Sequence, residues 1–138
     1  MTERWTLEKE FRFEASHQLT HHDGKCARLH GHSWVGRVGI SGSHLFLHGP
    51  KQGMLFDYAD LSAIIKPIVE RSLDHWHLND TLLDDGPTSE KVARWLWLQV
   101  AAELMKVTSS EELLDSLTVT IDETCTSSCI YSVVRGKT

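Results

Sequence analysis

Long apolar runs, an excess of positive charge and an even set of cysteines are all missing from this sequence. A membrane-spanning helix needs about 20 consecutive apolar residues, and because no stretch approaches that length we expect no membrane span. The segment Met1–Trp5 contains no apolar run either, so we expect no signal peptide. The 14 basic and 19 acidic residues give a net charge of −5, which argues against a nucleic-acid-binding surface built on bulk positive charge.

Cysteine is scarce, with three residues in the chain. An odd number in a sequence with no sign of secretion predicts reduced thiols in the cytoplasm. Histidine, in contrast, is abundant: there are nine, and seven of them lie between positions 17 and 48. The length of 138 residues fits one domain, residues 1–138, with a hydrophobic core of its own.

Alternation of apolar and polar residues predicts four strands. In the first strand the apolar residues share one parity: Trp5, Leu7, Phe11, Phe13 and Ala15. The same alternation predicts strands at Ser33–Ser41 and Leu117–Glu123, and a last short one at Ile130–Val134. Residues 42–53 are rich in glycine and include a proline, which predicts a turn or a loose hairpin tip.

Apolar residues at helical spacing predict two helices between the second and third strands. Asp57 can cap the first helix, and Pro67 inside it predicts a kink or a shifted boundary. The second helix should begin at Pro87-Thr88-Ser89-Glu90 and run through Val100. This order predicts an α+β domain, with an antiparallel four-stranded sheet and both helices on one face. We expect oligomerisation to cover the other face.

Three histidines share the apolar parity of their strands. His17 continues the series that includes Ala15, and His30 and His32 precede Trp34 on the next strand. If the strands extend that far, all three imidazoles point the same way, because residues two apart share a face. Three imidazole ligands with an open fourth position are typical of a catalytic zinc site, so we predict Zn²⁺ here. The alternative is a set of surface or hydrogen-bonded core histidines. The remaining histidines of this region are interpreted as solvated loop residues: His21, His22, His44 and His48.

Two further groups are candidates for acid–base chemistry. Cys26 lies in the loop between the predicted ligands, and the neighbouring Lys25 and Arg28, together with a nearby zinc ion, would favour its thiolate over the thiol. The alternative is a structural, half-buried thiol. Asp74 beside His75 can orient the imidazole and raise its basicity, although adjacent Asp-His pairs also occur by chance.

Glu123 ends the apolar face of the predicted strand Leu117–Glu123. An unpaired charge at that place is costly unless it meets a donor, for example the ring N–H and exocyclic amine of an aminopyrimidinone. The alternative is a strand end that frays into water. Cys125 and Cys129 lack the C-x-x-C spacing of metal knuckles and are interpreted as structural.

Together these residues resemble the 6-pyruvoyltetrahydropterin synthase superfamily, and most closely its bacterial branch, the 6-carboxytetrahydropterin synthases of queuosine (7-deazaguanine) biosynthesis. The resemblance runs nearly end to end. It is carried in chain order by Phe13-Glu14-Ala15-Ser16-His17, Cys26-Ala27-Arg28-Leu29-His30-Gly31-His32, Leu73-Asp74-His75 with Leu78-Asn79-Asp80, Pro87-Thr88-Ser89-Glu90, and Glu123-Thr124-Cys125-Thr126.

The resemblance implies the T-fold, whose subunits assemble around a barrel into a homohexamer or a similar oligomer with active sites between subunits. It implies zinc on His17, His30 and His32, and a catalytic set of Cys26, Asp74 and His75. It also implies that Glu123 anchors the pterin ring, helped by Thr88 or Ser89. The implied reaction is that of a carbon–carbon lyase. Its substrate, 7,8-dihydroneopterin triphosphate, would lose triphosphate and acetaldehyde to give 6-carboxytetrahydropterin.

Two other functions remain open at this point. The same fold could make 6-pyruvoyltetrahydropterin or process another pterin side chain, and the fate of the two-carbon fragment separates these reactions. A non-catalytic binding module stabilised by zinc is a candidate of a different class. It predicts a closed site with four ligands, whereas the three-histidine pattern and Cys26 favour catalysis.

Overall fold

The computed structural model describes residues 1–136, and its centre is a pair of long antiparallel strands. β1 (Trp5–His17) and β2 (His30–Gly42) are paired along their whole length. β4 (Thr118–Thr124) adds to the other side of β2, and β5 (Ser127–Ser132) pairs with β4. The first two strands reach further toward the histidines than the alternation alone required.

A short fifth strand changes the predicted sheet. β3 (Trp76–His77) runs parallel to β1 beside Ala15 and Ser16, so the order is β3-β1-β2-β4-β5. The α+β class is confirmed, but the prediction of four strands in a purely antiparallel sheet is wrong. A strand of two residues carries no alternation, and its place is set by the chain that returns from the preceding helix to the edge of β1.

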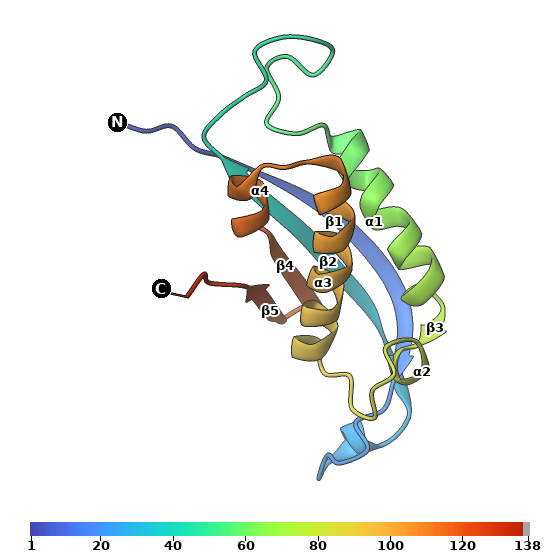
Figure 1. Cartoon of the computed structure of the whole chain (residues 1–138). Coiled ribbons are helices and arrows are strands. Elements are labelled where there is room, and N and C mark those ends of the chain that lie inside the picture. Colours follow the sequence, from blue (N-terminus) through green and yellow to red (C-terminus); the bar gives the residue numbers. More distant parts are fainter. Residues whose placement is uncertain (137–138) are drawn as a thin grey trace.

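Two long helices lie on one face of the sheet, as predicted (Figure 1). α1 (Tyr58–Ser72) is capped by Asp57, whose side chain accepts the Ala59 N–H, and it continues without a break through Pro67. α3 (Ser89–Val107) is capped by Thr88. Three short elements were not predicted: η1 (Lys25–Ala27), α2 (Leu78–Thr81) and α4 (Glu111–Asp115). Among the described residues, no helix combines the length and the apolar character needed to cross a membrane.

The hydrophobic core fills the space between the inner face of the sheet and the two helices. The strands contribute side chains of a single parity, including Phe13, Trp34, Val38 and Ile121, as the alternation predicted. The opposite face is polar: in β1, Glu8, Glu10, Arg12 and Glu14 are all exposed. The two faces therefore have different chemistry, and a side chain's parity decides which one it serves.

The segment between β2 and α1 closes on itself at the top of Figure 1. Phe46 N–H donates to the Met54 carbonyl, and Gly53 N–H donates to the Phe46 carbonyl, both at 2.9 Å. Gly49 and Gly53 have φ values of 86° and 82°, in the left-handed region that glycine adopts most easily. The predicted loose hairpin tip at residues 42–53 is confirmed in this form.

Candidate metal centre and active site

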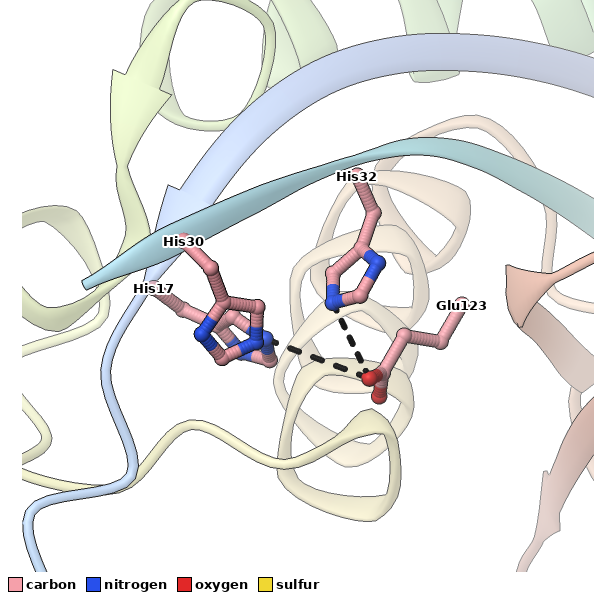
Figure 2. Close-up of side chains that lie close together, drawn as sticks. All are labelled: His17, His30, His32 and Glu123. Atoms are coloured by element: carbon pink, nitrogen blue, oxygen red, sulfur yellow. Dashed lines mark ion pairs between the residues drawn. The ribbon is translucent and has the colours of Figure 1, made fainter. Parts of the chain in front are cut away.

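Three histidines converge where β1 ends and β2 begins. His17 is the last residue of β1 and is opposite His30, the first residue of β2. His32 is opposite Ala15 and therefore points to the same face. Figure 2 shows His17, His30 and His32, here called the histidine cluster, with their rings turned toward one another. The predicted convergence of the three imidazoles is confirmed.

The nitrogen atoms of the histidine cluster are arranged as they would be around a metal ion. The Nε2 atoms of all three rings are buried, and none of them makes a hydrogen bond to another group of the described chain. One ligand atom from each ring and one carboxylate oxygen of Glu123 all lie within 4.8 Å of one another. Buried polar atoms are nearly always paired, and a cation between the rings would supply the missing partner. Imidazole nitrogens at this spacing fit a zinc-type ion.

Backbone carbonyl groups orient two of the rings. His17 donates from Nδ1 to the Pro87 carbonyl at 2.8 Å, and His30 donates from Nδ1 to the Arg28 carbonyl at 2.7 Å. A carbonyl oxygen can only accept, so Nδ1 carries the proton and Nε2 keeps its lone pair. The indole ring of Trp34 packs edge-on against the cluster, with ring centroids 5.1 Å apart for His17 and 5.3 Å apart for His32.

Burial favours the neutral form of two rings of the cluster. His17 is fully buried, and this burial lowers its pKa below the ordinary value; the Pro87 carbonyl and Glu123 oppose the shift. Burial also lowers the pKa of His32, again against the effect of Glu123. A metal ligand must be the neutral imidazole. The same burial that disfavours the proton therefore favours a metal ion.

Glu123 lies against the cluster, on the inner face of β4. One of its carboxylate oxygens is 3.1 Å from His32 Nε2 and 4.0 Å from His17 Nε2, as drawn in Figure 2. The alternation of the strand correctly predicts that Glu123 lies on the same face as Ile121, but it does not predict that Glu123 lies close to the histidines. Strand parity gives the face of a side chain and does not give its distance along the neighbouring strand. The carboxylate offers a fourth possible ligand atom, whereas the sequence predicted three ligands and an open fourth position.

A hollow of about 430 Å³ adjoins Glu123. Its walls are formed by Ser89, Glu90, Glu123, Thr124, Ser127, Ser128 and Cys129. Two predicted substrate-binding residues, Ser89 and Glu123, are thus brought together. Thr88 is not part of this wall, because its side chain accepts the Lys91 N–H as the cap of α3.

Of the seven residues that line the hollow, only Ser89 and Glu123 were predicted as site residues, and two of the others carry a titratable group: Glu90 and Cys129. Glu90 directly follows Ser89 in the motif already singled out, so the motif could have identified it. Cys129, interpreted from the sequence as structural, has its pKa raised by burial and also by the nearby Glu90. Its place opposite Ile121 on the inner face of the sheet could be inferred only once β5 was known to pair with β4.

Cys26 lies in η1, in the loop that joins the ends of β1 and β2. Its side chain is half-buried and belongs to no disulfide. Within the described chain, the metal-type group around the histidine cluster does not include its sulfur. The loop is tied to the end of β1 by a hydrogen bond from Leu19 N–H to the Cys26 carbonyl at 2.9 Å.

Asp74 and His75 form the expected pair, and it is bound to the edge of β1 that faces away from β2. Asp74 Oδ2 is 3.0 Å from His75 Nδ1, while Asp74 Oδ1 accepts the Glu14 N–H at 2.8 Å. The Glu14 N–H lowers the pKa of Asp74 most, and His75 adds to the shift against the effect of burial. His75 has a φ of 65° and a side chain that is 79% exposed.

The hollow beside His75 opens mainly on the outer face. It measures about 480 Å³, and its walls include the outer-face residues Glu14, Ser16 and Ser33. At the end of the strands it is also lined by Ala15 and His32. Within the described chain, the metal-type group around the histidine cluster includes neither Asp74 nor His75.

A protein-family model described as "6-pyruvoyl tetrahydropterin synthase" matches residues 6–133 of this sequence. The chain belongs to this family. Among curated relatives, a 6-carboxy-5,6,7,8-tetrahydropterin synthase of Synechocystis sp. is 43% identical over 127 residues, which is 92% of each chain. The enzyme of the same name from Haemophilus influenzae is 32% identical, over 91% of this chain and 96% of its own.

A solved structure agrees with the family assignment. The 6-pyruvoyl tetrahydropterin synthase of Caenorhabditis elegans superposes with a TM-score of 0.75 at 26% identity, covering 96% of this chain and 97% of that one. An uncharacterised protein from Wolinella succinogenes has the same fold, with a TM-score of 0.72 at 17% identity. The fold of the described chain is thus the T-fold subunit of the 6-pyruvoyl tetrahydropterin synthase family.

Proposed function

We propose that this chain is a zinc-dependent lyase that converts 7,8-dihydroneopterin triphosphate to 6-carboxy-5,6,7,8-tetrahydropterin in queuosine biosynthesis, with loss of triphosphate and acetaldehyde. The observation that carries this proposal is the 43% identity, over 92% of each chain, to a relative named for that product. The relatives from Haemophilus influenzae and Bacillus subtilis bear the same name.

Zinc is the metal that the histidine cluster suits best. One ligand nitrogen from each of its three rings lies within 4.8 Å of the others, and zinc commonly binds three imidazoles in catalytic sites. When bound there, zinc would polarise the side-chain oxygens of the substrate. His17 and His30 are held in the required tautomer by carbonyl groups, so the site is pre-organised before any ligand arrives.

The pterin ring is proposed to enter the hollow beside Glu123. A carboxylate can accept from both the ring N–H and the exocyclic amine of the pterin, which gives two charge-assisted hydrogen bonds. Glu123 already lines the hollow, so it only has to turn from His32 toward the ligand. The Ser89 hydroxyl lies in the same wall. Thr88 contributes by fixing the first turn of α3 behind that wall.

Cys26, Asp74 and His75 are proposed to move the side-chain protons of the substrate. Cys26 follows the strand end that carries His17, whereas the Asp74–His75 pair faces outward. A general acid or base must come within hydrogen-bond reach of the proton it moves. We therefore propose that the pair acts in the active site of a neighbouring copy, and that the enzyme is a homo-oligomer, a hexamer in the simplest case.

Features of the sheet support an assembly of this kind. Among the described residues, β1 has a strand partner on its outer edge only at Ala15 and Ser16. At the opposite edge of the sheet, β5 pairs with β4 alone. Open edges of this length invite pairing with another chain. A barrel closed by several copies would remove both edges.

A product assay tests the proposal. The zinc-loaded protein is incubated with 7,8-dihydroneopterin triphosphate, and the products are identified by mass spectrometry. We expect 6-carboxytetrahydropterin and acetaldehyde in equal amounts, and no turnover after removal of zinc with a chelator. A pyruvoyl product without acetaldehyde would instead assign the activity named for the Caenorhabditis elegans structure. Zinc binding without any product would indicate a binding module.

A further inference from the structure

Asn79 holds both backbone hydrogen-bonding groups of one residue next to the metal centre. It is the only asparagine in the chain and lies in α2. Its Oδ1 accepts the Gln18 N–H at 2.9 Å, and its Nδ2 donates to the Gln18 carbonyl at 2.8 Å. Gln18 directly follows His17, where β1 ends. The side chain of Asn79 thus makes the two hydrogen bonds that a neighbouring strand would make, at the first residue after the end of β1.

The contacts continue from Gln18 to the loop of Cys26. Gln18 Nε2 donates to the Ala27 carbonyl at 2.8 Å, and Leu19 N–H donates to the Cys26 carbonyl at 2.9 Å. Two consecutive carbonyls of η1 are therefore held by Gln18, which Asn79 binds, and by Leu19, the residue that follows it. These hydrogen bonds connect α2 to Cys26 through one short piece of chain.

The other contacts of this loop lie on either side of Cys26. Residues 20–25 are exposed, and in the described chain no residue of η1 is fully buried. On one side, Thr20 Oγ1 donates to the Asp85 carbonyl at 2.8 Å, and His21 Nε2 lies 2.7 Å from Asp85 Oδ2. On the other side, the Arg28 carbonyl accepts from His30 Nδ1. The bonds made by Gln18 and Leu19 are the ones that join the carbonyls of Cys26 and Ala27 themselves to the end of β1.

We propose that Asn79 is a positioning residue that sets the place of Cys26 relative to the metal centre by clamping Gln18. The inference rests on the proposed role of Cys26 in proton transfer. A displacement of about 1 Å at a reacting group can cost roughly a hundredfold in rate. By binding Gln18, Asn79 prevents that displacement. In the described chain, the walls of the hollow beside Glu123 do not include Asn79.

Kinetics of matched variants test this proposal. In the zinc-loaded enzyme, we expect Asn79→Ala to lower kcat by about ten- to a hundredfold, with KM nearly unchanged and full zinc content. Thr81→Val is the control, because it removes a side-chain bond from the same short helix to the Ser72 carbonyl without touching Gln18. It should keep kcat. Asn79→Asp retains the size of the side chain and the acceptor for the Gln18 N–H, so its kcat should lie between those of the wild type and Asn79→Ala. It replaces Asn79→Ala in the test if that variant does not fold.

A double mutant tests whether Asn79 acts through Gln18. Gln18→Ala removes the next bond in the series, the one to Ala27. If both residues act on Cys26 by one route, the double variant should be no slower than the slower single variant, because effects along one network are not additive. Fully additive losses in kcat would overturn the proposed route.

Hydrogen exchange of the Leu19 amide separates this inference from the proposed function. Exchange should be at least about tenfold faster in Asn79→Ala than in the wild type or Thr81→Val, because the loop opens more often. Unchanged exchange would overturn the clamp. If exchange accelerates while kcat does not fall, Cys26→Ala decides the cause. An inactive Cys26→Ala variant would then refute the positioning role, and an active one would refute the proposed role of Cys26 itself.

Discussion

At the scale of single residues, the histidine cluster is built so that metal and proton compete for the same nitrogens. The only N–H group of neutral His17 donates a hydrogen bond to the Pro87 carbonyl, and burial opposes the binding of a second proton to the ring. The Nε2 atom is left buried with a free lone pair. In an ordinary core this arrangement would be costly, since an unpaired buried polar atom costs about 1–3 kcal/mol. A bound metal ion removes that cost.

Removal of one histidine should therefore remove the metal. We expect His32→Ala to lose most of its zinc, because two imidazoles bind zinc far more weakly than three. The wild type should hold about one zinc ion per chain. Elemental analysis after extensive dialysis measures both values. His48→Ala is the control, since His48 lies in the exposed loop between β2 and α1. Full zinc content in His32→Ala would rule out its assignment as a ligand.

Glu123 has two possible partners, and one substitution separates them. Glu123→Gln keeps the shape of the side chain but loses its charge and presents an amide donor to the pterin's own N–H groups. The loss of a hydrogen bond to a charged group costs roughly 1.5–3 kcal/mol, so pterin affinity should fall about ten- to a hundredfold. Zinc content should not change if the carboxylate serves the pterin.

The result is measured by pterin titration and elemental analysis of the same samples. Loss of zinc together with pterin would make Glu123 a fourth metal ligand, as its distance of 3.1 Å from His32 Nε2 allows. Unchanged affinity and unchanged zinc would mean that the carboxylate is only a solvated strand end. Glu90→Gln provides a comparison from the same hollow.

At the scale of elements, the turn between α2 and α3 contains both a carboxylate that stabilises the fold and a carbonyl group that orients a predicted metal ligand. Asp84 Oδ1 accepts the Gly86 N–H at 2.8 Å and the Lys91 Nζ at 2.9 Å. These bonds shape the chain just before Pro87, whose carbonyl orients His17. Lys91 lowers the pKa of Asp84 most, and the Gly86 N–H contributes as well, against the effect of burial.

The lowered pKa of Asp84 predicts a pH-dependent contribution to stability. A carboxyl group whose folded pKa is below its ordinary value of 3.8 stabilises the fold fully above that value and loses the contribution as pH falls through the folded pKa. Asp84→Asn should therefore lower the free energy of unfolding by about 0.5–1 kcal/mol at neutral pH, and by less as pH falls below 3.8. Urea unfolding of the zinc-free proteins measures the difference. An effect of equal size at every pH would mean that the charge of Asp84 is irrelevant.

Strand parity was sufficient to predict much of the site from the sequence, because a period of two is a direct consequence of strand geometry. It placed His17, His30 and His32 on one face and ended the face of β4 at Glu123. It could not find β3, which has only two residues, or the clamp on Gln18. Asn79 and Gln18 are far apart in the chain, and a bond between a side chain and a distant backbone group leaves no periodic pattern.

Parity was also insufficient for the Asp74–His75 pair. The pair lies in the turn after α1, where neither a helical nor a strand period applies. Its outward direction follows from the bonds of Asp74 and His75 to the backbone of Glu14, together with the left-handed φ of His75. A motif can identify His75 as a member of a catalytic set. It cannot tell whether His75 acts in the active site of its own chain or in that of a neighbouring copy.

At the scale of the whole molecule, the proposed active site is divided along the sheet. The histidine cluster, Glu123 and the hollow beside Glu123 belong to the inner face, whereas Asp74 binds the edge of β1 and His75 lines a hollow with outer-face residues. Within the described chain, the metal-type group includes neither Asp74 nor His75. A second copy paired at an open edge of the sheet would complete the site, and it would also cover a polar strand edge that a single chain leaves open.

Mixed oligomers test this division. Cys26→Ala and His75→Ala should each lower turnover at least about a hundredfold when expressed alone, the usual scale for a general acid or base. If each active site takes Cys26 from one copy and His75 from its neighbour, co-expression of the two variants should restore about a quarter of the wild-type sites by random assembly. A mixture of Cys26→Ala with Glu123→Gln is the control, because both residues belong to the same side of one chain's site, and it should restore nothing. Steady-state turnover per chain, with both variants carrying different affinity tags, gives the fraction of restored sites. Activity no higher than that of the separate variants would place Cys26 and His75 in the same chain's site and would require the loop of Cys26 to reach around the edge of the sheet.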